Sequence, residues 1–260
     1  MTAYYNEIDP YAAQWLRNLI SAGHIAPGDV DERSIVDVQP DDISGYTQCH
    51  FFAGIGGWSY GLRLAGWPDD RRVWTGSCPC QPLSSAGKQK GHLDERHLWP
   101  AFQHLIAKCR PPVVFGEQVA GSLGLRWMSA VRSDLEGDRY ACGVACLPGF
   151  FAGAPQQRER IYWVASSDSP GCDRVKKQDE QPTAWSKVPR RNDTDGRSSS
   201  FWSAAVQMEG ADGTRRLLSP GIKLLADGLS EGMGRMRGYG NAIIPQVAAE
   251  VIGAYMEIAA

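Results

Sequence analysis

The chain of 260 residues is long enough to bury a full core, and its composition, 43% hydrophobic and 22% charged, is that of an ordinary globular protein. A formal net charge of -2 excludes a global basic field that would attract nucleic acid, although a local basic face could still do so. The seven cysteines show no disulfide framework, the start does not resemble a signal peptide, and no apolar stretch approaches the length of about 18 residues that spans a membrane, so we expect a cytoplasmic protein.

The first part of the chain predicts a short strand, a helix and a second strand. Residues 2–5 are extended and apolar, and Asp9 is suited to be the N-cap of a helix over 11–21, whose apolar residues fall on one stripe. Residues 25–30 predict a brief strand that ends in an acidic residue, and 39–47 predict a loop.

A glycine-rich turn follows the next apolar run. Residues 48–52 predict a strand, 53–57 a turn and 59–65 a helix. This order brings backbone N–H groups close to a nucleotide-like ligand. Alone it is a weak signal, because the glycines could simply make a tight turn.

A cysteine bracketed by prolines comes after the apolar pair at 73–74. Cys80 lies between Pro79 and Pro82, and proline restricts both its own backbone and that of the residue before it. Such a turn can hold one side chain in one direction, which makes Cys80 a candidate nucleophile once its pKa is lowered from about 8.5. The alternative is a proline-rich turn with a buried thiol.

Helices and strands are predicted to alternate through the middle of the chain. A polar stretch at 84–96 predicts a mobile loop, and an apolar strand over 111–119 delivers Glu117 at its end. The other elements are helices over 98–108 and 123–135, and strands over 140–146 and 161–165. From Ser166 the chain becomes polar without a clear period, and a helix over 246–258 closes it.

Five short segments together resemble the cytosine-C5 methyltransferase family, which uses S-adenosylmethionine. In chain order they are the cofactor motif Phe52–Gly57, the nucleophile motif Pro79-Cys80-Gln81, Glu117-Gln118-Val119 for the family's Glu-Asn-Val, Gln156–Arg160 for its Gln-x-Arg-x-Arg, and Gly240-Asn241-Ala242 for its Gly-Asn-Ala. Each segment is short, but their joint occurrence in the family's order is highly specific.

Two acidic cofactor segments of the family stand in a different place here. In the family they lie between the glycine-rich motif and the cysteine motif, which are separated in this chain only by 58–78. Asn6–Ala12 resembles the first and Gly28–Val30 the second, and both precede the glycine-rich motif. The resemblance therefore implies a circular permutation that begins at the family's second strand. Because the family's first strand lies between its second and fourth, this rearrangement keeps every neighbour and changes only the connections.

The resemblance implies an α/β architecture, namely a Rossmann-like class I methyltransferase fold with a mostly parallel seven-stranded sheet and a small target-recognition region. Residues 1–165 would form the catalytic and cofactor-binding domain, 166–235 the target-recognition region, and 236–260 a C-terminal motif and a helix returning to the catalytic domain. The implied protein is a monomeric DNA (cytosine-5-)-methyltransferase of a restriction-modification system or a phage. It would act on a flipped cytosine in a short sequence of double-stranded DNA.

The resemblance also implies catalytic roles. Cys80 would add to C6 of the cytosine, Glu117 would contact N3, and Arg158 and Arg160 would bind O2 or a nearby phosphate. Cys78 is the less favoured nucleophile, because the family has a proline immediately before its cysteine.

The cofactor pocket is implied in the same way. Gly54 and Gly56 would allow close approach of the methionine moiety, Phe52 would pack against the adenine, Glu7 would bind the ribose hydroxyls and Asp29 the adenine amino group. The remaining pocket residues are Ala53, Ile55, Gly57, Ile8, Val30, Pro79, Asn241 and Ala242.

Some alternatives stay open at this point. Gln118 replaces the family's Asn and offers the same amide one methylene further out, which is compatible with reduced activity and does not imply its loss. The same scaffold could act on RNA, which presents unstacked bases, or belong to an inactive DNA-binding relative. No metal site is expected, because Cys78 with Cys80 and Cys142 with Cys146 lack the paired spacing of zinc ligands.

Overall fold

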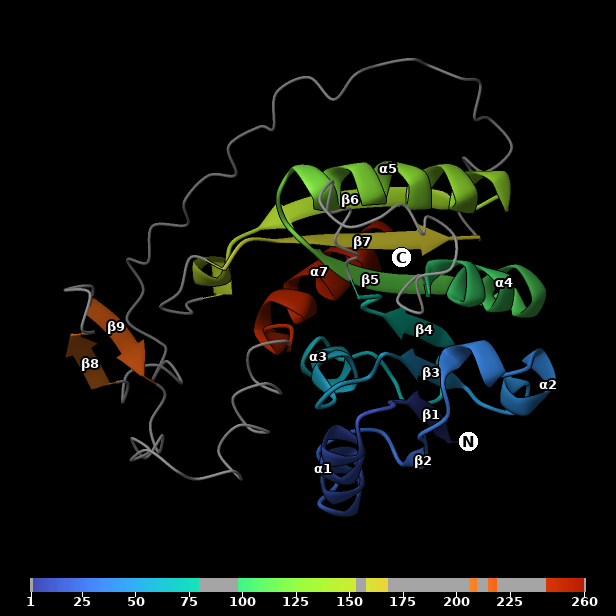
Figure 1. Ribbon diagram of the computed structural model, residues 1–260, viewed down its shortest axis with the longest axis horizontal. Helices are drawn as coiled ribbons and strands as arrows, with labels where there is room; N and C mark the ends of the chain where they lie inside the picture. Colours follow the sequence, from blue (N-terminus) through green and yellow to red (C-terminus); the bar gives the residue numbers. More distant parts are fainter. Residues whose placement is uncertain are drawn as a thin grey trace, which may run out of the picture.

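One mixed sheet organises the computed structural model, which describes residues 2–79, 98–152, 158–167, 206–209, 215–218 and 242–259. Its strands, in order across the sheet, are β2 (Gly28–Asp31), β1 (Ala3–Asn6), β3 (Gln48–Phe51), β4 (Val73–Gly76), β5 (Val113–Val119), β7 (Arg160–Ser166) and β6 (Ala141–Leu147). The strands from β2 to β5 are parallel, and β7 is antiparallel to both β5 and β6 (Figure 1). The predicted α/β class and the mostly parallel seven-stranded sheet are confirmed.

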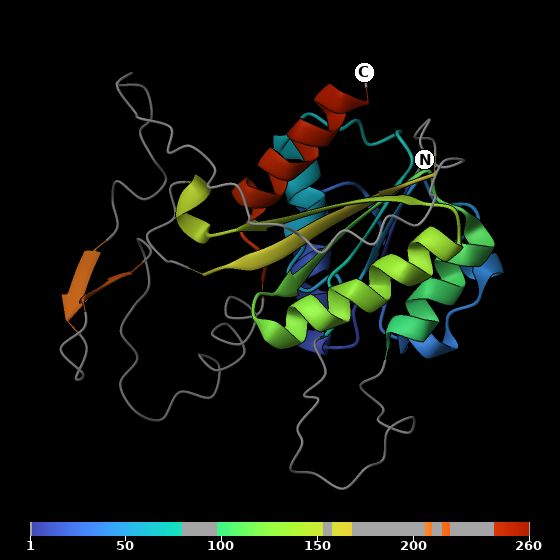
Figure 2. The same cartoon turned by 90° about the horizontal axis from the view of Figure 1, so that it is seen from above.

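Helices cover both faces of this sheet (Figure 2). One face carries α1 (Pro10–Ser21), α3 (Gly57–Leu64) and α7 (Pro245–Ile258), and the other carries α2 (Pro40–Ile43), α4 (Trp99–Cys109) and α5 (Ser122–Gly137). Short 3₁₀ turns lie at Ile35–Asp37 and Gly149–Ala152, and β8 (Val206–Glu209) pairs with β9 (Arg215–Leu218) in a separate antiparallel ladder.

Local sequence accounts for several of these elements. The Asp9 carboxylate accepts hydrogen bonds from the backbone N–H groups of Tyr11 at 2.8 Å and Ala12 at 3.3 Å, so it is the N-cap of α1, with Pro10 in the first turn. The strands β1, β3 and β4 are buried along their whole length, as expected for central strands of a parallel sheet that is covered on both faces.

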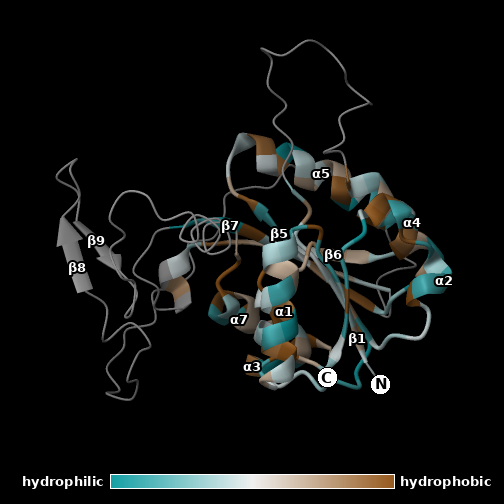
Figure 3. Ribbon diagram, turned by 60° about the horizontal axis from the view of Figure 1, so that its bottom comes forward, coloured by the Kyte–Doolittle hydropathy of each residue, from teal (hydrophilic) through white to brown (hydrophobic). Residues whose placement is uncertain are grey.

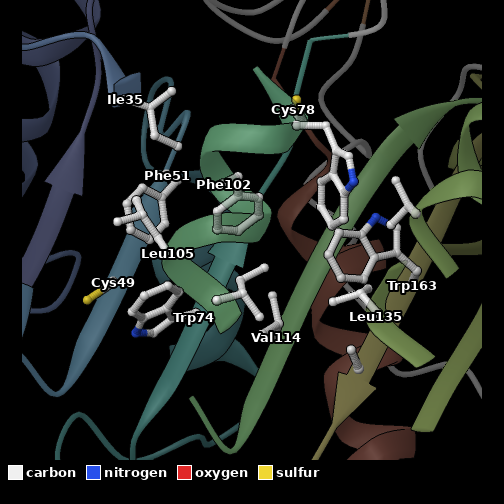
Figure 4. Packing of buried hydrophobic residues seen from close by; sticks show 14 of the residues in the cluster. Ile35, Cys49, Phe51, Trp74, Cys78, Phe102, Leu105, Val114, Leu135 and Trp163 are labelled. Carbon is white, nitrogen blue, oxygen red and sulfur yellow. The ribbon is translucent and has the colours of Figure 1, made fainter. Parts of the chain in front are cut away.

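The core lies in layers on the two faces of the sheet. The largest cluster packs Phe51, Trp74 and Val114 of the strands against Phe102 and Leu105 of α4 (Figure 4). Smaller clusters lie beneath α3 and α7 and beneath α1. The helices accordingly show both hydrophobic and hydrophilic stretches in Figure 3, which is typical of helices with one buried side.

Three features differ most from the sequence-based expectation. The predicted strand over 25–30 is observed at Gly28–Asp31, because Ala26 is buried outside the ladder, where its carbonyl accepts the Tyr5 hydroxyl at 2.6 Å. The predicted loop over 39–47 contains the single-turn helix α2. The ladder of β8 and β9 falls in the segment for which no element was predicted. Most of that segment and the predicted loop over 84–96 lie outside the described residues.

Three chain segments meet at the amino-terminal edge of the sheet. The Thr47 backbone N–H donates to the Thr2 carbonyl at 3.1 Å, and the Val73 N–H donates to the Thr47 carbonyl at 3.3 Å. The starts of β1, β3 and β4 are therefore direct neighbours. Within the described ranges, no helix combines the length and the apolar character needed to cross a membrane.

Candidate active site

The opposite, carboxyl-terminal edge of the sheet gathers most of the predicted site residues that the structure describes. Glu7 follows β1, Phe52 follows β3, and Ser77 follows β4. Glu117 lies near the end of β5, and Arg160 begins the antiparallel β7, which brings it to the same edge. Ligands of open α/β sheets bind outside the carboxyl ends of the strands. Cys80, Asn241, Gln156 and Gln157 lie outside the described residues.

The glycine-rich turn after β3 has an unusual backbone. Phe52, Gly54 and Gly56 have positive φ values of 52°, 54° and 81°, and Gly56 in the left-handed region is the N-cap of α3. Glycine adopts this conformation without strain, which explains its use at the second and third of these positions. A Cβ atom at Gly54 would meet no atom within 4 Å, so the space next to the turn is open.

Glu7 joins the turn to β1. Its Oε2 accepts the Gly54 N–H at 2.7 Å, and its Oε1 accepts the Asp9 N–H at 2.9 Å. Burial raises the pKa of Glu7, while these two hydrogen bonds oppose the rise. The structure thus brings Glu7 and the glycine-rich turn together although they are far apart in sequence.

The residues at this edge fit S-adenosylmethionine. A carboxylate can accept about four hydrogen bonds, so Glu7 retains capacity for two ribose hydroxyls. Ile8 is 65% exposed beside it and offers an apolar surface to an aromatic base. Phe52 and Ile55 are half-buried at the turn, as are its Ala53 and Gly54.

Asp29 and Val30 do not reach this edge. Asp29 is paired with Tyr4 in the lower half of β2, three residues short of the level of Glu7, or about 10 Å along the strand. Its carboxylate accepts the Tyr46 hydroxyl at 2.8 Å on the exposed edge of the sheet. Val30 packs with the core cluster beneath α1. The strand continues to Asp31, which is the acidic residue at its carboxyl end.

Glu117 and Arg160 form an ion pair that is largely withdrawn from water. Arg160 Nε lies 2.8 Å from Glu117 Oε1, and Glu117 is only 7% exposed. Burial raises the pKa of Glu117, and the positive charges of Arg160 and Arg158 reduce the rise without cancelling it. Glu117 is therefore a carboxyl that holds a proton more readily than an exposed glutamate does.

The chain that leads to Cys80 is held at two points. Gln118 is 2% exposed, and its Nε2 donates to the Cys78 carbonyl at 3.1 Å. The Trp58 indole N–H donates to Ser77 Oγ at 3.0 Å. The Cys78 side chain is buried in the core, and Pro79 is exposed. Sequence reasoning missed Ser77 and Trp58, although a polar residue directly after a buried strand is a signal for Ser77.

Arg158 connects the site to the last part of the chain. Its Nη2 donates to the Ala242 carbonyl at 2.9 Å, and its Nε is buried without a partner among the described residues. Burial and the neighbouring Arg160 lower the pKa of Arg158. Ala242 lies shortly before α7, and the next residue, Ile243, packs against Gly57. The C-terminal segment and the glycine-rich turn are thus brought together.

These features define a Rossmann-like α/β domain that is built to hold a nucleotide-type cofactor beside a buried carboxyl group. A family model described as C-5 cytosine-specific DNA methylase matches residues 67–198, about half of the chain. The chain belongs to this family, whose members use S-adenosylmethionine as methyl donor.

Individual relatives match shorter stretches. Type II methyltransferase M.AplI of Arthrospira platensis is 35% identical over 107 residues, which is 40% of this chain and 30% of that protein. Type II methyltransferase M.AluI of Cellulosimicrobium cellulans is 29% identical over 117 residues, 41% of this chain and 22% of that protein. The matches therefore span less than a third of either relative. A crystal structure of a Spodoptera frugiperda DNMT2 mutant covers 68% of this chain and 45% of its own, with 16% identity and a TM-score of 0.46.

Proposed function

We propose that this protein transfers a methyl group from S-adenosylmethionine to C5 of a cytosine in double-stranded DNA. One observation carries the proposal: the buried pair of Glu117 and Arg160 shares a sheet edge with the turn held by Glu7 and with the chain that enters the Cys80 motif. Membership in the C-5 cytosine-specific DNA methylase family supports the reaction class.

The cofactor would be held by residues of two chain segments. Glu7 would accept the ribose hydroxyls, Ile8 and Phe52 would pack against the adenine, and Gly54 and Gly56 would admit the methionine moiety. When bound, the cofactor supplies an electrophilic methyl group. Asp29 is left out of this set because it lies too far down β2.

The base would be activated by Cys80 and Glu117. The Cys80 thiolate forms a bond to C6, the π electrons move toward C5 and N3, and the proton held by Glu117 compensates the charge that develops at N3. After C5 has accepted the methyl group, loss of the C5 proton to solvent and cleavage of the C6–S bond would restore the aromatic ring and release the Cys80 thiolate. The raised pKa of Glu117 favours the protonated form that this role needs. Arg160 orients the carboxyl group, and Gln118 positions the chain ahead of Cys80.

The substrate must leave the duplex to reach this edge. Residues 166–235 would read the flanking sequence, and 1–165 with 236–260 would form the catalytic part of a protein that acts as a monomer in the cytoplasm. The description of the matching family model, a C-5 cytosine-specific DNA methylase, supports DNA as the substrate.

We also infer that the chain is a circular permutation of the family's order. The β1–α1–β2 unit precedes the glycine-rich turn in sequence, yet β1 lies beside β3 and Glu7 binds Gly54. The edge position of β2, with β1 between it and β3, is the arrangement expected for the family's second and third strands.

The decisive experiment measures methyl transfer. Purified protein is incubated with labelled S-adenosylmethionine and either duplex DNA or RNA, and methylated cytosines are mapped by sequencing. We expect labelled DNA, no transfer by Cys80→Ser, and a loss of about 10²–10⁴-fold for Glu117→Gln, which removes the acid at constant shape.

The matched control is Cys78→Ala, which removes a thiol two residues away and should retain transfer. Label in RNA and not in DNA would refute the choice of substrate. Loss in the Cys78 variant with retention in the Cys80 variant would reassign the nucleophile.

A further inference from the structure

The segment that carries Cys80 re-enters the described part of the chain at the start of α4. Leu98 is the first described residue after Pro79, and Trp99 begins the helix. No side chain caps this helix end, yet Trp99 is only 5% exposed. The first turn of α4 is therefore held by Trp99 and not by a conventional cap.

Trp99 is fixed by one hydrogen bond and a group of rings. Its indole N–H donates to Asp134 Oδ2 of α5 at 2.8 Å. Its ring meets those of Phe102, Trp127 and Trp163 at nearly perpendicular angles, with centroid distances of 5.9, 5.7 and 6.2 Å. Edge-to-face contacts of this kind favour one ring orientation.

Trp163 links this group to the strands of the candidate site. It lies on β7 three residues after Arg160, and its backbone is paired with Gly116, the residue before Glu117 (Figure 4 shows its ring). A Cβ atom at Gly116 would lie 2.1 Å from the Trp163 ring, so the ring lies directly on β5. Trp99 thus contacts a ring that packs on β5 and β7, the two strands that carry Glu117 and Arg160, on the face of the sheet opposite to those two side chains.

We propose that Asp134 is a positioning residue for methyl transfer. By orienting Trp99, it fixes the downstream end of the Cys80 segment against the two strands that carry Glu117 and Arg160. The upstream end is fixed to β5 by Gln118 through the Cys78 carbonyl. The residues on both sides of the segment, Cys78 and Trp99, are thus held against β5, directly through Gln118 or through the Trp163 ring. This role rests on the proposed function, in which Cys80 is the nucleophile.

The chain contains a matched control for this bond. Gln103 of α4 donates to Oδ2 of Asp138, the C-cap residue of α5, at 2.8 Å, four residues beyond Trp99 and Asp134. The two bonds join the same pair of helices by the same kind of acceptor. Only the one at Trp99 is next to the Cys80 segment. The carboxylates of Asp134 and Asp138 reach the surface or lie close to it, so their removal leaves no buried charge.

The test compares Asp134→Ala, Asp134→Asn and Asp138→Ala in the full chain. We expect both alanine variants to lower the thermal unfolding midpoint by similar amounts. Only Asp134→Ala should lower kcat, by about tenfold or more, because a misplaced reactive group is costly while KM for S-adenosylmethionine stays unchanged. Asp134→Asn keeps an oxygen acceptor for the indole N–H and should restore most of kcat.

Hydrogen exchange of the first turn of α4 supplies a readout that does not depend on activity. We expect faster exchange of Trp99–Gln103 in Asp134→Ala than in Asp138→Ala. Equal losses of kcat in both alanine variants, or unchanged kcat in Asp134→Ala, would overturn the positioning role. If the wild-type protein transfers no methyl group, the proposed function is refuted. If hydrogen exchange in the first turn of α4 is equal in Asp134→Ala and Asp138→Ala, the role of Asp134 in fixing Trp99 is refuted independently of activity.

Discussion

At the scale of single residues, His50 shows how strongly the interior of this sheet constrains a titratable group. Its Nδ1 lies 2.8 Å from Thr75 Oγ1, its Nε2 lies 3.3 Å from Gln48 Oε1, and its ring stacks on Tyr5 with centroids 4.9 Å apart. Burial lowers the pKa of His50 to about 3, because the imidazolium form would lose its hydration without gaining an anionic partner in contact.

This pKa predicts an acid-dependent loss of stability. The unfolded chain takes up a proton at His50 below pH 6.5, and the folded chain does so only near pH 3. The free energy of unfolding is therefore unaffected by protonation of this group above pH 6.5 and decreases as the pH falls below that value. Between these two pKa values the free energy of unfolding decreases by about 1.4 kcal/mol for each pH unit. Between pH 7.5 and 5.0 we expect the wild type to lose about 2 kcal/mol more than His50→Gln does. Urea unfolding at the two pH values measures this difference.

The comparison with His50→Gln isolates the histidine, since Glu7 and Glu117, whose pKa values are raised, are present in both proteins. Parallel losses of stability in the two proteins would show that His50 is not the group responsible.

Sequence motifs indicate which residues belong to one site, whereas the level of a residue along the sheet depends on strand register. Glu117 and Arg160 were expected together and form an ion pair at 2.8 Å. Asp29 was expected in the cofactor pocket because Gly28–Val30 resembles a family segment, but its level in the sheet depends on the pairing of Tyr4 with Asp29, which no local pattern reveals. The partner of Gln118, a backbone carbonyl on another strand exit, is likewise set only by the fold.

At the scale of elements, two paired glycines let aromatic rings lie directly on the sheet. Gly76 of β4 is paired with Gly116 of β5. A Cβ atom would lie 2.4 Å from the Phe102 ring at the first position and 2.1 Å from the Trp163 ring at the second. Neither distance is possible between real atoms, so α4 sits as close as it does because these side chains are missing.

This packing predicts opposite outcomes for two glycine-to-alanine substitutions. Gly116→Ala must displace the Trp163 ring, which Trp99 confines, and should destabilise the protein by about 1–3 kcal/mol. Gly137→Ala, at the end of α5, meets no atom within 4 Å and should be neutral or stabilising by up to about 1 kcal/mol. Thermal and urea unfolding of the two variants provide the measurement, and equal destabilisation would contradict the packing argument.

Most elements of the sheet and its covering helices could be predicted because their apolar periodicity is local. The N-cap at Asp9 and the apolar face of α1 are examples. The α2 turn and the β8–β9 ladder could not, since α2 is a single turn and both strands of the ladder lie in a polar stretch without a clear period.

At the scale of the whole molecule, the order of segments along the chain can differ from their order in the sheet. The β1–α1–β2 unit is attached to the rest of the sheet through β3 and returns to it at Thr47. The starts of β1, β3 and β4 adjoin one another through the hydrogen bonds of Thr47 with Thr2 and Val73. New connections among these points would therefore be short.

A rearranged chain tests this view. Residues 2–46 are moved between Arg71 and Arg72, with a few glycines at each new junction, which reverses the circular permutation that we infer. We expect cooperative unfolding with a stability within about 1 kcal/mol of the original, because loop closure depends weakly on length, and unchanged binding of S-adenosylmethionine by calorimetry.

The control moves residues 5–46 instead, which cuts β1 between Tyr4 and Tyr5 and should prevent folding. Failure of the first rearrangement, or equal success of both, would show that the β1–α1–β2 unit is not an independent piece of the architecture.

The meeting of Thr2, Thr47 and Val73 lies at the end of the sheet opposite to Glu7 and Glu117. The chain connections and the candidate site thus lie at opposite edges of the sheet. Rearrangements of the gene that change the connections at one edge would leave the positions of the reactive atoms at the other edge unchanged, so natural selection for activity would tolerate them.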